Sequence, residues 1–134
     1  MKKLLLLLLL SLGFIGSANA STSIIMCDAK SVEITQFGAR TTFPNSTKTI
    51  TMILDGNKSK GITNITIKEI LSSGDSFSTT YSILKQDDRA LTALINKPSS
   101  HGAEILFLNK QDGTFSIANL SMNAALGTTG RCYD

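Results

Sequence analysis

The sequence predicts an all-β domain, an antiparallel meander of about seven or eight strands, with a barrel slightly preferred to a sandwich. Apolar and polar residues alternate with a period of two over several segments, which is typical of half-buried strands. Turn-forming sequences recur at intervals of roughly 8–13 residues, a spacing typical of antiparallel sandwiches and barrels. Two cysteines flank the domain, so one disulfide is expected to join its two ends.

The first 20 residues predict a secretory signal peptide rather than part of the fold. Lys2 and Lys3 precede an apolar run that begins at Leu4, and Ala18-Asn19-Ala20 supplies the small residues of a cleavage site. The apolar run spans about 12 residues, whereas a membrane-spanning helix needs roughly 20. We therefore expect residues 1–20 to be removed, leaving 21–134 as a single exported β domain with no membrane span.

Charge argues against nucleic acid as a partner of this domain. Lys2 and Lys3 are two of the 13 basic residues, against 10 acidic ones, so the cleaved chain has a net charge of +1. Clusters of Lys and Arg with interleaved aromatic residues, which are typical of nucleic-acid binding, are missing from the sequence, so no nucleic-acid partner is expected.

Cys27 and Cys132 are predicted to form one disulfide between the first strand and the last. Disulfides persist in the oxidising compartments to which a signal peptide leads. The bond would close a loop of about 100 residues, which the chain-entropy estimate values at up to ~4–5 kcal/mol. Two buried free thiols are the alternative.

Alternating segments in the first half of the domain predict four strands. They are residues 32–35, 47–54, 62–71 and 76–83. Ile62 has the opposite parity to Ile65, so a β-bulge is expected near Thr63 and Asn64. The last of these segments is the cleanest amphipathic strand of the chain.

The second half is less regular. Residues 91–95 and 103–108 are apolar on both faces, which predicts central strands or strands that contact a second layer. Residues 114–118 alternate again. A short helix is expected over 118–126, where Met122 and Leu126 are four residues apart.

Turn sequences connect these segments. They are residues 55–61, 72–75, 86–89, 96–102 and 110–113. In the last of them, Gly113 is expected to adopt the left-handed conformation of a bulged hairpin.

Catalytic and metal-binding patterns are weak. His101 is the single histidine and lies beside Ser99 and Ser100, so one interpretation is a hydrolase in which Asp87 or Asp88 orients the ring. A G-x-S-x-G elbow and a glycine-rich oxyanion loop are missing, and a solvated loop histidine is the preferred interpretation. We expect no catalytic residues, no metal site and no cofactor, and hence a protein that is not an enzyme.

Four aromatic residues are the candidate ligand-binding set: Phe77, Tyr81, Phe107 and Phe115. Such side chains can line a barrel cavity that holds a small apolar ligand. They can also simply fill the core, which is the favoured interpretation because large side chains on strand faces are mostly packing.

These observations predict a small, non-catalytic binding or interaction protein of the bacterial envelope, in the periplasm or outside the cell. Its partner would be a small apolar ligand or an envelope protein contacted by loops such as 55–61 and 96–102. A secreted inhibitor of a host or competitor enzyme and a small hydrolase using the His101 loop are the alternatives.

Overall fold

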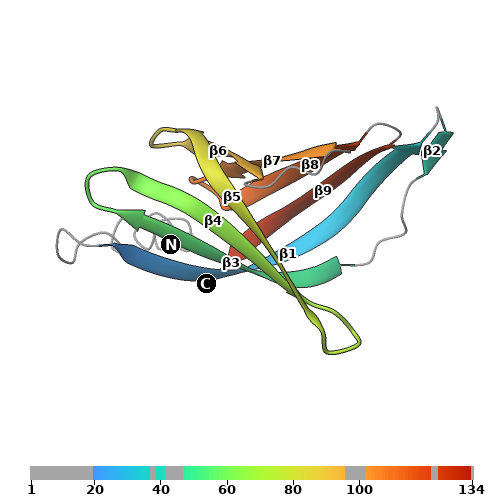
Figure 1. The fold of residues 1–134 in the computed structure, drawn as a ribbon, viewed down its shortest axis with the longest axis horizontal. Helices are drawn as coiled ribbons and strands as arrows, with labels where there is room; N and C mark the ends of the chain where they lie inside the picture. The colour runs from blue at the N-terminus through green and yellow to red at the C-terminus, as the bar shows by residue number, and fades with distance from the viewer. Residues whose placement is uncertain (1–19, 37–38, 42–46, 96–101, 122–123, 134) are drawn as a thin grey trace.

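The computed structural model describes residues 20–36, 39–41, 47–95, 102–121 and 124–133. In the described residues the secondary structure consists of nine β-strands (Figure 1). They are β1 (Ser21–Gln36), β2 (Ala39–Thr41), β3 (Thr47–Asn57), β4 (Gly61–Ile70), β5 (Ser76–Gln86), β6 (Ala90–Ile95), β7 (Gly102–Asn109), β8 (Thr114–Ser121) and β9 (Ala124–Tyr133). This part of the chain contains no helix long and apolar enough to cross a membrane.

Eight of the strands close into an antiparallel barrel. Each strand from β3 to β8 pairs with the strand that follows it, and β1 pairs with β3 on one side and with β9 on the other. Figure 1 shows the result, with β9 in red beside β1 in blue. The short β2 pairs with one end of β1 and lies outside the barrel. The predicted antiparallel meander and the preference for a barrel are therefore confirmed.

Closure depends on the length of β1. Its first part, residues 21–30, pairs with β3, and residues 26–36 pair with β9, with a register shift between Ser31 and Glu33. Alternation predicted a strand only over 32–35, because residues 24–27 are apolar on both faces: Ile24 and Met26 are exposed, and Ile25 and Cys27 are buried. Pairing with neighbours on both sides extends the strand well beyond that segment.

The alternating face of β3 points into the barrel, as predicted. Ile50, Met52 and Leu54 are at most 3% exposed, while Thr51 and Ile53 between them face outward and are partly exposed. The same parity on the other strands builds a continuous apolar core. Its members include Ile25, Ile65, Ile67, Leu91, Ala93, Leu106 and Leu108. In β6 and β7 the outward apolar residues Leu94 and Phe107 are exposed rather than covered by a second layer.

Two bulges adjust which side chains face inward. Asp55 pairs with Asn64 and Gly56 with Ile62, so Thr63 is the extra residue of the bulge predicted in β4. In β5 the register shifts between Ile83 and Lys85. After this shift the Gln86 side chain donates hydrogen bonds to two backbone carbonyl oxygens of the neighbouring hairpin, at 2.7 Å from Ile62 and 3.1 Å from Lys60.

One end of the barrel is filled by side chains packed against backbone. Phe115 lies opposite Gly130 and is 3% exposed. A Cβ atom at Gly130 would lie 2.5 Å from the Phe115 ring and 2.2 Å from the carbonyl oxygen of Asp28. Glycine is required here because the Asp28 carbonyl oxygen and the Phe115 ring occupy the space that any larger residue would need.

The disulfide joins the strands that close the barrel. Cys27 lies directly opposite Cys132, their Cα atoms are 3.9 Å apart, and both residues are buried. Directly opposed residues in antiparallel strands approach most closely at pairs that do not exchange backbone hydrogen bonds. The backbone amide of Cys132 donates to Gly113 instead. The predicted link between the first and last strands is confirmed.

The helix expected over 118–126 is wrong. β8 continues to Ser121, and β9 begins at Ala124, where Leu126 lies opposite Asn119; Met122 falls outside the described residues. Pairing of both segments with neighbouring strands outweighs the weak helical spacing. The hairpin before β8 agrees with its prediction, since Gly113 has a φ of 72° and its amide donates to Asn109.

Candidate ligand-binding site

A cavity of about 420 Å³ occupies the other end of the barrel, on the side of the β4–β5 turn. All eight strands of the barrel contribute to its wall, and every contributing residue has inward parity in the strand registers. The cavity is therefore the open mouth of the barrel interior. It lies beyond the packed layer formed by the core.

Much of the wall is apolar. Its members are Ala29, Ile50, Ile67, Phe77, Ile95, Ile117 and Leu126. Phe77 is 61% exposed and forms part of the rim, whereas Ile50 and Ile67 belong to the buried core beneath. Such a wall favours an apolar group in contact with it, because that group leaves water on binding.

A second set of lining residues is polar. They are Lys48, Glu69, Thr79, Tyr81, Glu104, Asn119 and Thr128. Three of them form a hydrogen-bonded group around the Glu104 carboxylate. The Tyr81 hydroxyl donates to Oε1, and the Asn119 side-chain amide donates to Oε2 at 2.7 Å. Strands β5, β7 and β8 supply one member each, so the barrel frame sets the geometry of the group.

Burial keeps Tyr81 in its neutral, donating form. The residue is 1% exposed, and this desolvation, together with the hydrogen bond to Glu104 and its negative charge, raises the pKa of Tyr81 well above its ordinary value of 10.0. The hydroxyl therefore stays protonated across the physiological range. It holds the carboxylate of Glu104 without neutralising it.

Lys48 and Glu69 form an ion pair at the rim. Their Nζ and Oε2 atoms are 2.8 Å apart, and the two side chains remain 43% and 23% exposed. Exposed pairs of this kind contribute only about 0–1 kcal/mol to stability. The positive charge of Lys48 is, however, paired with the carboxylate of Glu69 and not with that of Glu104.

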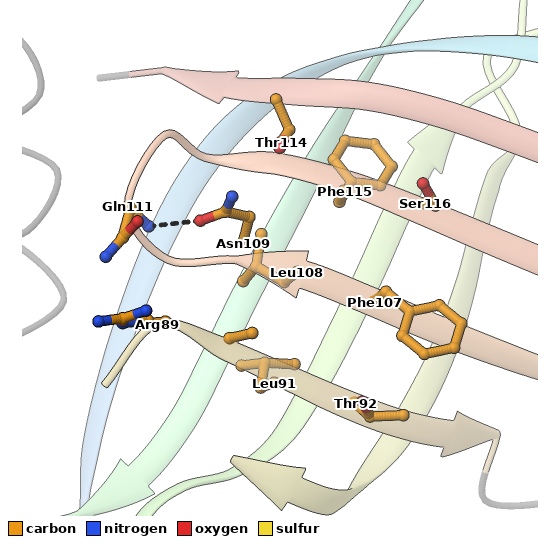
Figure 2. Close-up of a pocket in the computed structure, with 11 residues that line it drawn as sticks. Arg89, Leu91, Thr92, Phe107, Leu108, Asn109, Gln111, Thr114, Phe115 and Ser116 are labelled. Carbon is orange, nitrogen blue, oxygen red and sulfur yellow. Dashed lines mark hydrogen bonds between the residues drawn. The ribbon is translucent and has the colours of Figure 1, made fainter. Parts of the chain in front are cut away.

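The four predicted aromatic residues do not form one wall. Phe77 and Tyr81 line the mouth cavity, whereas Phe107 and Phe115 belong to a separate depression of about 400 Å³ over β6, β7 and β8. Figure 2 shows the latter two on neighbouring strands, β7 and β8. Phe107 lies opposite Ser116 and Leu108 opposite Phe115, so the two rings have opposite parity. The four residues therefore do not line one shared cavity in this structure, and two of them, Tyr81 and Phe115, belong to the buried core.

The depression in Figure 2 is lined mainly by outward-facing side chains such as Thr92, Phe107 and Ser116. Phe107 is 48% exposed there, while Phe115 is buried in the core on the other face of the sheet. The depression has walls from only three strands, in contrast to the mouth cavity. It is therefore the weaker candidate for holding a small molecule.

Glu104 and Asn119 were absent from the sequence-based candidates. A signal for Glu104 was present, because it is a charged residue within the apolar segment 103–108 and shares the parity of Leu106 and Leu108. A charge on the buried face of a strand needs a partner or a function. Asn119 gives no such signal, since its role depends on lying opposite Glu104 in the register.

Of the residues considered for catalysis, some lie outside the described residues and the others lie far from the mouth cavity. Ser99, Ser100 and His101 lie outside the described residues. Asp87 is a turn residue, whose carboxylate accepts backbone hydrogen bonds from Arg89 and Ala90 at 2.8 and 2.9 Å. These bonds lower the pKa of Asp87. Asp87 and Asp88 precede β6, at the end of the barrel away from the mouth.

Metal-ligating side chains do not gather in the described ranges, where no three His, Cys, Asp or Glu residues come together.

Comparison with known proteins finds no match: no protein-family model, no curated protein and no solved structure is significantly similar to this chain.

Proposed function

We propose that this protein is an exported, non-catalytic binding protein that holds a small molecule in the mouth of its barrel. The observation that carries this proposal is the mouth cavity, about 420 Å³ in volume and walled by inward residues of all eight barrel strands. Ligand pockets in proteins commonly have volumes of roughly 300–1,000 Å³ and combine an apolar wall with a few placed polar groups.

The wall defines the kind of molecule. An apolar body would contact Phe77, Ile95 and Leu126, and a polar group would reach the hydrogen-bonded group at Glu104. The sequence suggested a purely apolar ligand. The polar groups in the wall favour an amphipathic one, since an apolar ligand would bury Glu104 without a new partner.

Export is supported by the first 20 residues, with their basic head, apolar run and Ala18-Asn19-Ala20 cleavage sequence. The Cys27–Cys132 disulfide is consistent with that route, because structural disulfides persist in oxidising compartments such as the periplasm or the extracellular space. Intact mass of the protein recovered from its host tests this part. A mass that includes residues 1–20 would contradict it.

Native mass spectrometry of protein purified from its own host tests the binding role. We expect the wild type to retain a small molecule. Thr79→Trp should lose it, because Thr79 lines the cavity and an indole would occupy the space. Ser78→Trp is the matched control, since Ser78 is the adjacent outward and exposed residue of the same strand. A wild type that binds no small molecule in its host, or equal retention by both variants, would overturn the proposal.

A protein partner is the second candidate, and the outer face of β6–β8 favours it. Leu94, Phe107 and Leu120 are 36%, 48% and 52% exposed there, and all three point outward. Exposed apolar patches often mark interaction sites. If an envelope protein is the partner, Phe107→Ala should weaken its capture and Thr79→Trp should not. An enzyme inhibitor would act through such a surface as well.

A further inference from the structure

We propose that the ligand of the mouth cavity is a small organic cation, an amine with an apolar body, whose ammonium group donates hydrogen bonds to Glu104. This inference rests on the binding role proposed above and specifies its chemistry. Three charged residues line the cavity in the described part of the chain: Lys48, Glu69 and Glu104. The net charge of these three side chains is −1, and the ligand is expected to place its own charge where that negative charge lies.

Lys48 and Glu69 neutralise each other at the rim, where Nζ and Oε2 are 2.8 Å apart. Glu104 is held differently. Its two oxygens accept hydrogen bonds from the Tyr81 hydroxyl and the Asn119 amide, both of which are neutral donors. Among the described residues no cation lies within ion-pair distance of Glu104. Among the described lining residues, the unneutralised charge is therefore at Glu104.

The carboxylate also retains free acceptor capacity. An ionised carboxylate offers about four lone-pair sites, and the two neutral donors occupy two of them. The two bonds hold the group in one orientation, so a ligand need not order it on binding. A hydroxyl and an ammonium group can both donate a hydrogen bond to this carboxylate, but only the ammonium group adds Coulomb attraction between opposite charges. An ammonium group is thus favoured over a hydroxyl at this position.

The apolar wall selects the rest of the molecule. Ile95 and Ile117 flank the polar group from β6 and β8, and Phe77 lies at the rim. A fully hydrophilic cation would gain nothing from contact with these apolar side chains. An apolar anion would be repelled by the carboxylate of Glu104. A primary amine carrying a short apolar chain or ring satisfies both parts of the wall.

Three probes with one shared body separate charge from shape: 4-phenylbutylamine, 4-phenylbutanol and 4-phenylbutyrate. Isothermal titration calorimetry or NMR titration of the disulfide-intact protein measures their affinities. We expect the amine to bind about tenfold or more tighter than the alcohol, because its positive charge is attracted to Glu104, whereas the alcohol offers the carboxylate only a neutral donor. The carboxylate should bind most weakly. Thr79→Trp should weaken all three, whereas Ser78→Trp should not.

Glu104→Gln is the decisive variant. The amide has nearly the same shape, and the Asn119 amide can rotate so that the network keeps its hydrogen bonds. We expect the preference for the amine over the alcohol to fall to about threefold or less, with the alcohol losing much less affinity than the amine. Glu69→Gln is the matched control, because it also removes one negative charge from the cavity wall but leaves Glu104 in place. It should retain most of the preference.

Each outcome decides one of the two proposals or both. Binding of all three probes with similar affinity, blocked by Thr79→Trp, would overturn the cation preference and leave the binding role supported. An equal loss of preference in the two glutamate variants would also overturn the role of Glu104, because charge alone would explain it. Failure of all three probes to bind at millimolar concentration would overturn both proposals.

Discussion

Cutting the Cys27–Cys132 disulfide should remove much of the stability of the barrel. The cysteines are 105 residues apart in the sequence. In the chain-entropy estimate, a cross-link of that span lowers the entropy of the unfolded chain enough to stabilise the fold by about 4.8 kcal/mol. Domains of this size typically have a total free energy of unfolding of about 5–15 kcal/mol. The bond thus accounts for a large share of it.

Urea unfolding of the oxidised and the reduced wild type measures this effect. Reduction should be done in denaturant, followed by refolding with reductant, because both cysteines are buried. With a slope of about 1–2 kcal/mol per M urea, the midpoint should fall by about 2.5–5 M. The slope itself should rise, since the unfolded chain without the cross-link exposes more surface.

The double variant Cys27→Ala/Cys132→Ala separates the cross-link from packing. It shares the uncross-linked unfolded state of the reduced wild type but lacks the two buried sulfur atoms. Any further loss of stability in the variant therefore belongs to packing. A midpoint that falls by less than about 1 M on reduction would refute the reasoning, because it would mean that the cross-link restricts the unfolded chain very little.

Two further predictions concern aromatic residues. Phe115→Ala should lower the free energy of unfolding by about 3–5 kcal/mol, since the ring is buried against Gly130, whereas Phe107→Ala should cost less than about 1 kcal/mol; equal losses in urea unfolding would contradict the assignment of the two rings to opposite faces. Tyr81→Phe should make stability less sensitive to alkaline pH. Because the pKa of Tyr81 is raised in the folded protein, the unfolded chain loses the hydroxyl proton at a lower pH than the folded protein does. The contribution of this residue to the free energy of unfolding is therefore complete below pH 10.0 and is lost as the pH rises above that value. Unfolding at about pH 8 and about pH 11 checks this, and parallel losses in wild type and variant would contradict it.

Much of the fold follows from local patterns. Alternation placed Ile50, Met52 and Leu54 on the buried face, and the parity change at Ile62 indicated a bulge near Thr63 and Asn64, where Thr63 is the extra residue. These predictions succeed because side-chain direction in a strand depends only on position along it. The disulfide followed from compartment and placement, and the pairing of Cys27 with Cys132 confirms it.

The rest depended on strand register, which no local pattern contains. Gly130 weakens the strand signal of β9, yet it is required because the Phe115 ring occupies the neighbouring space. The same limit applies to the site. Tyr81 and Glu104 were visible in the sequence as an aromatic residue and a charge on apolar strands, but their contact arises from the arrangement of β5, β6 and β7. The placement of Phe107 and Tyr81 in separate depressions also depends on the register and parity of their strands.

Closure of the barrel by β1 and β9 has a consequence for the order of folding. In every other pair of neighbouring barrel strands, the two strands follow one another along the chain, if the short β2 is left out. Those ladders can therefore form within short segments, as hairpins do. The closing ladder joins residues roughly a hundred positions apart and must wait for a large loop to close, which is slow. Until then both edges are free to pair with other chains. The mouth cavity is also incomplete, because Ala29, Leu126 and Thr128 come from these two strands. We therefore expect ligand binding to appear together with the disulfide, as the final event in the maturation of the molecule.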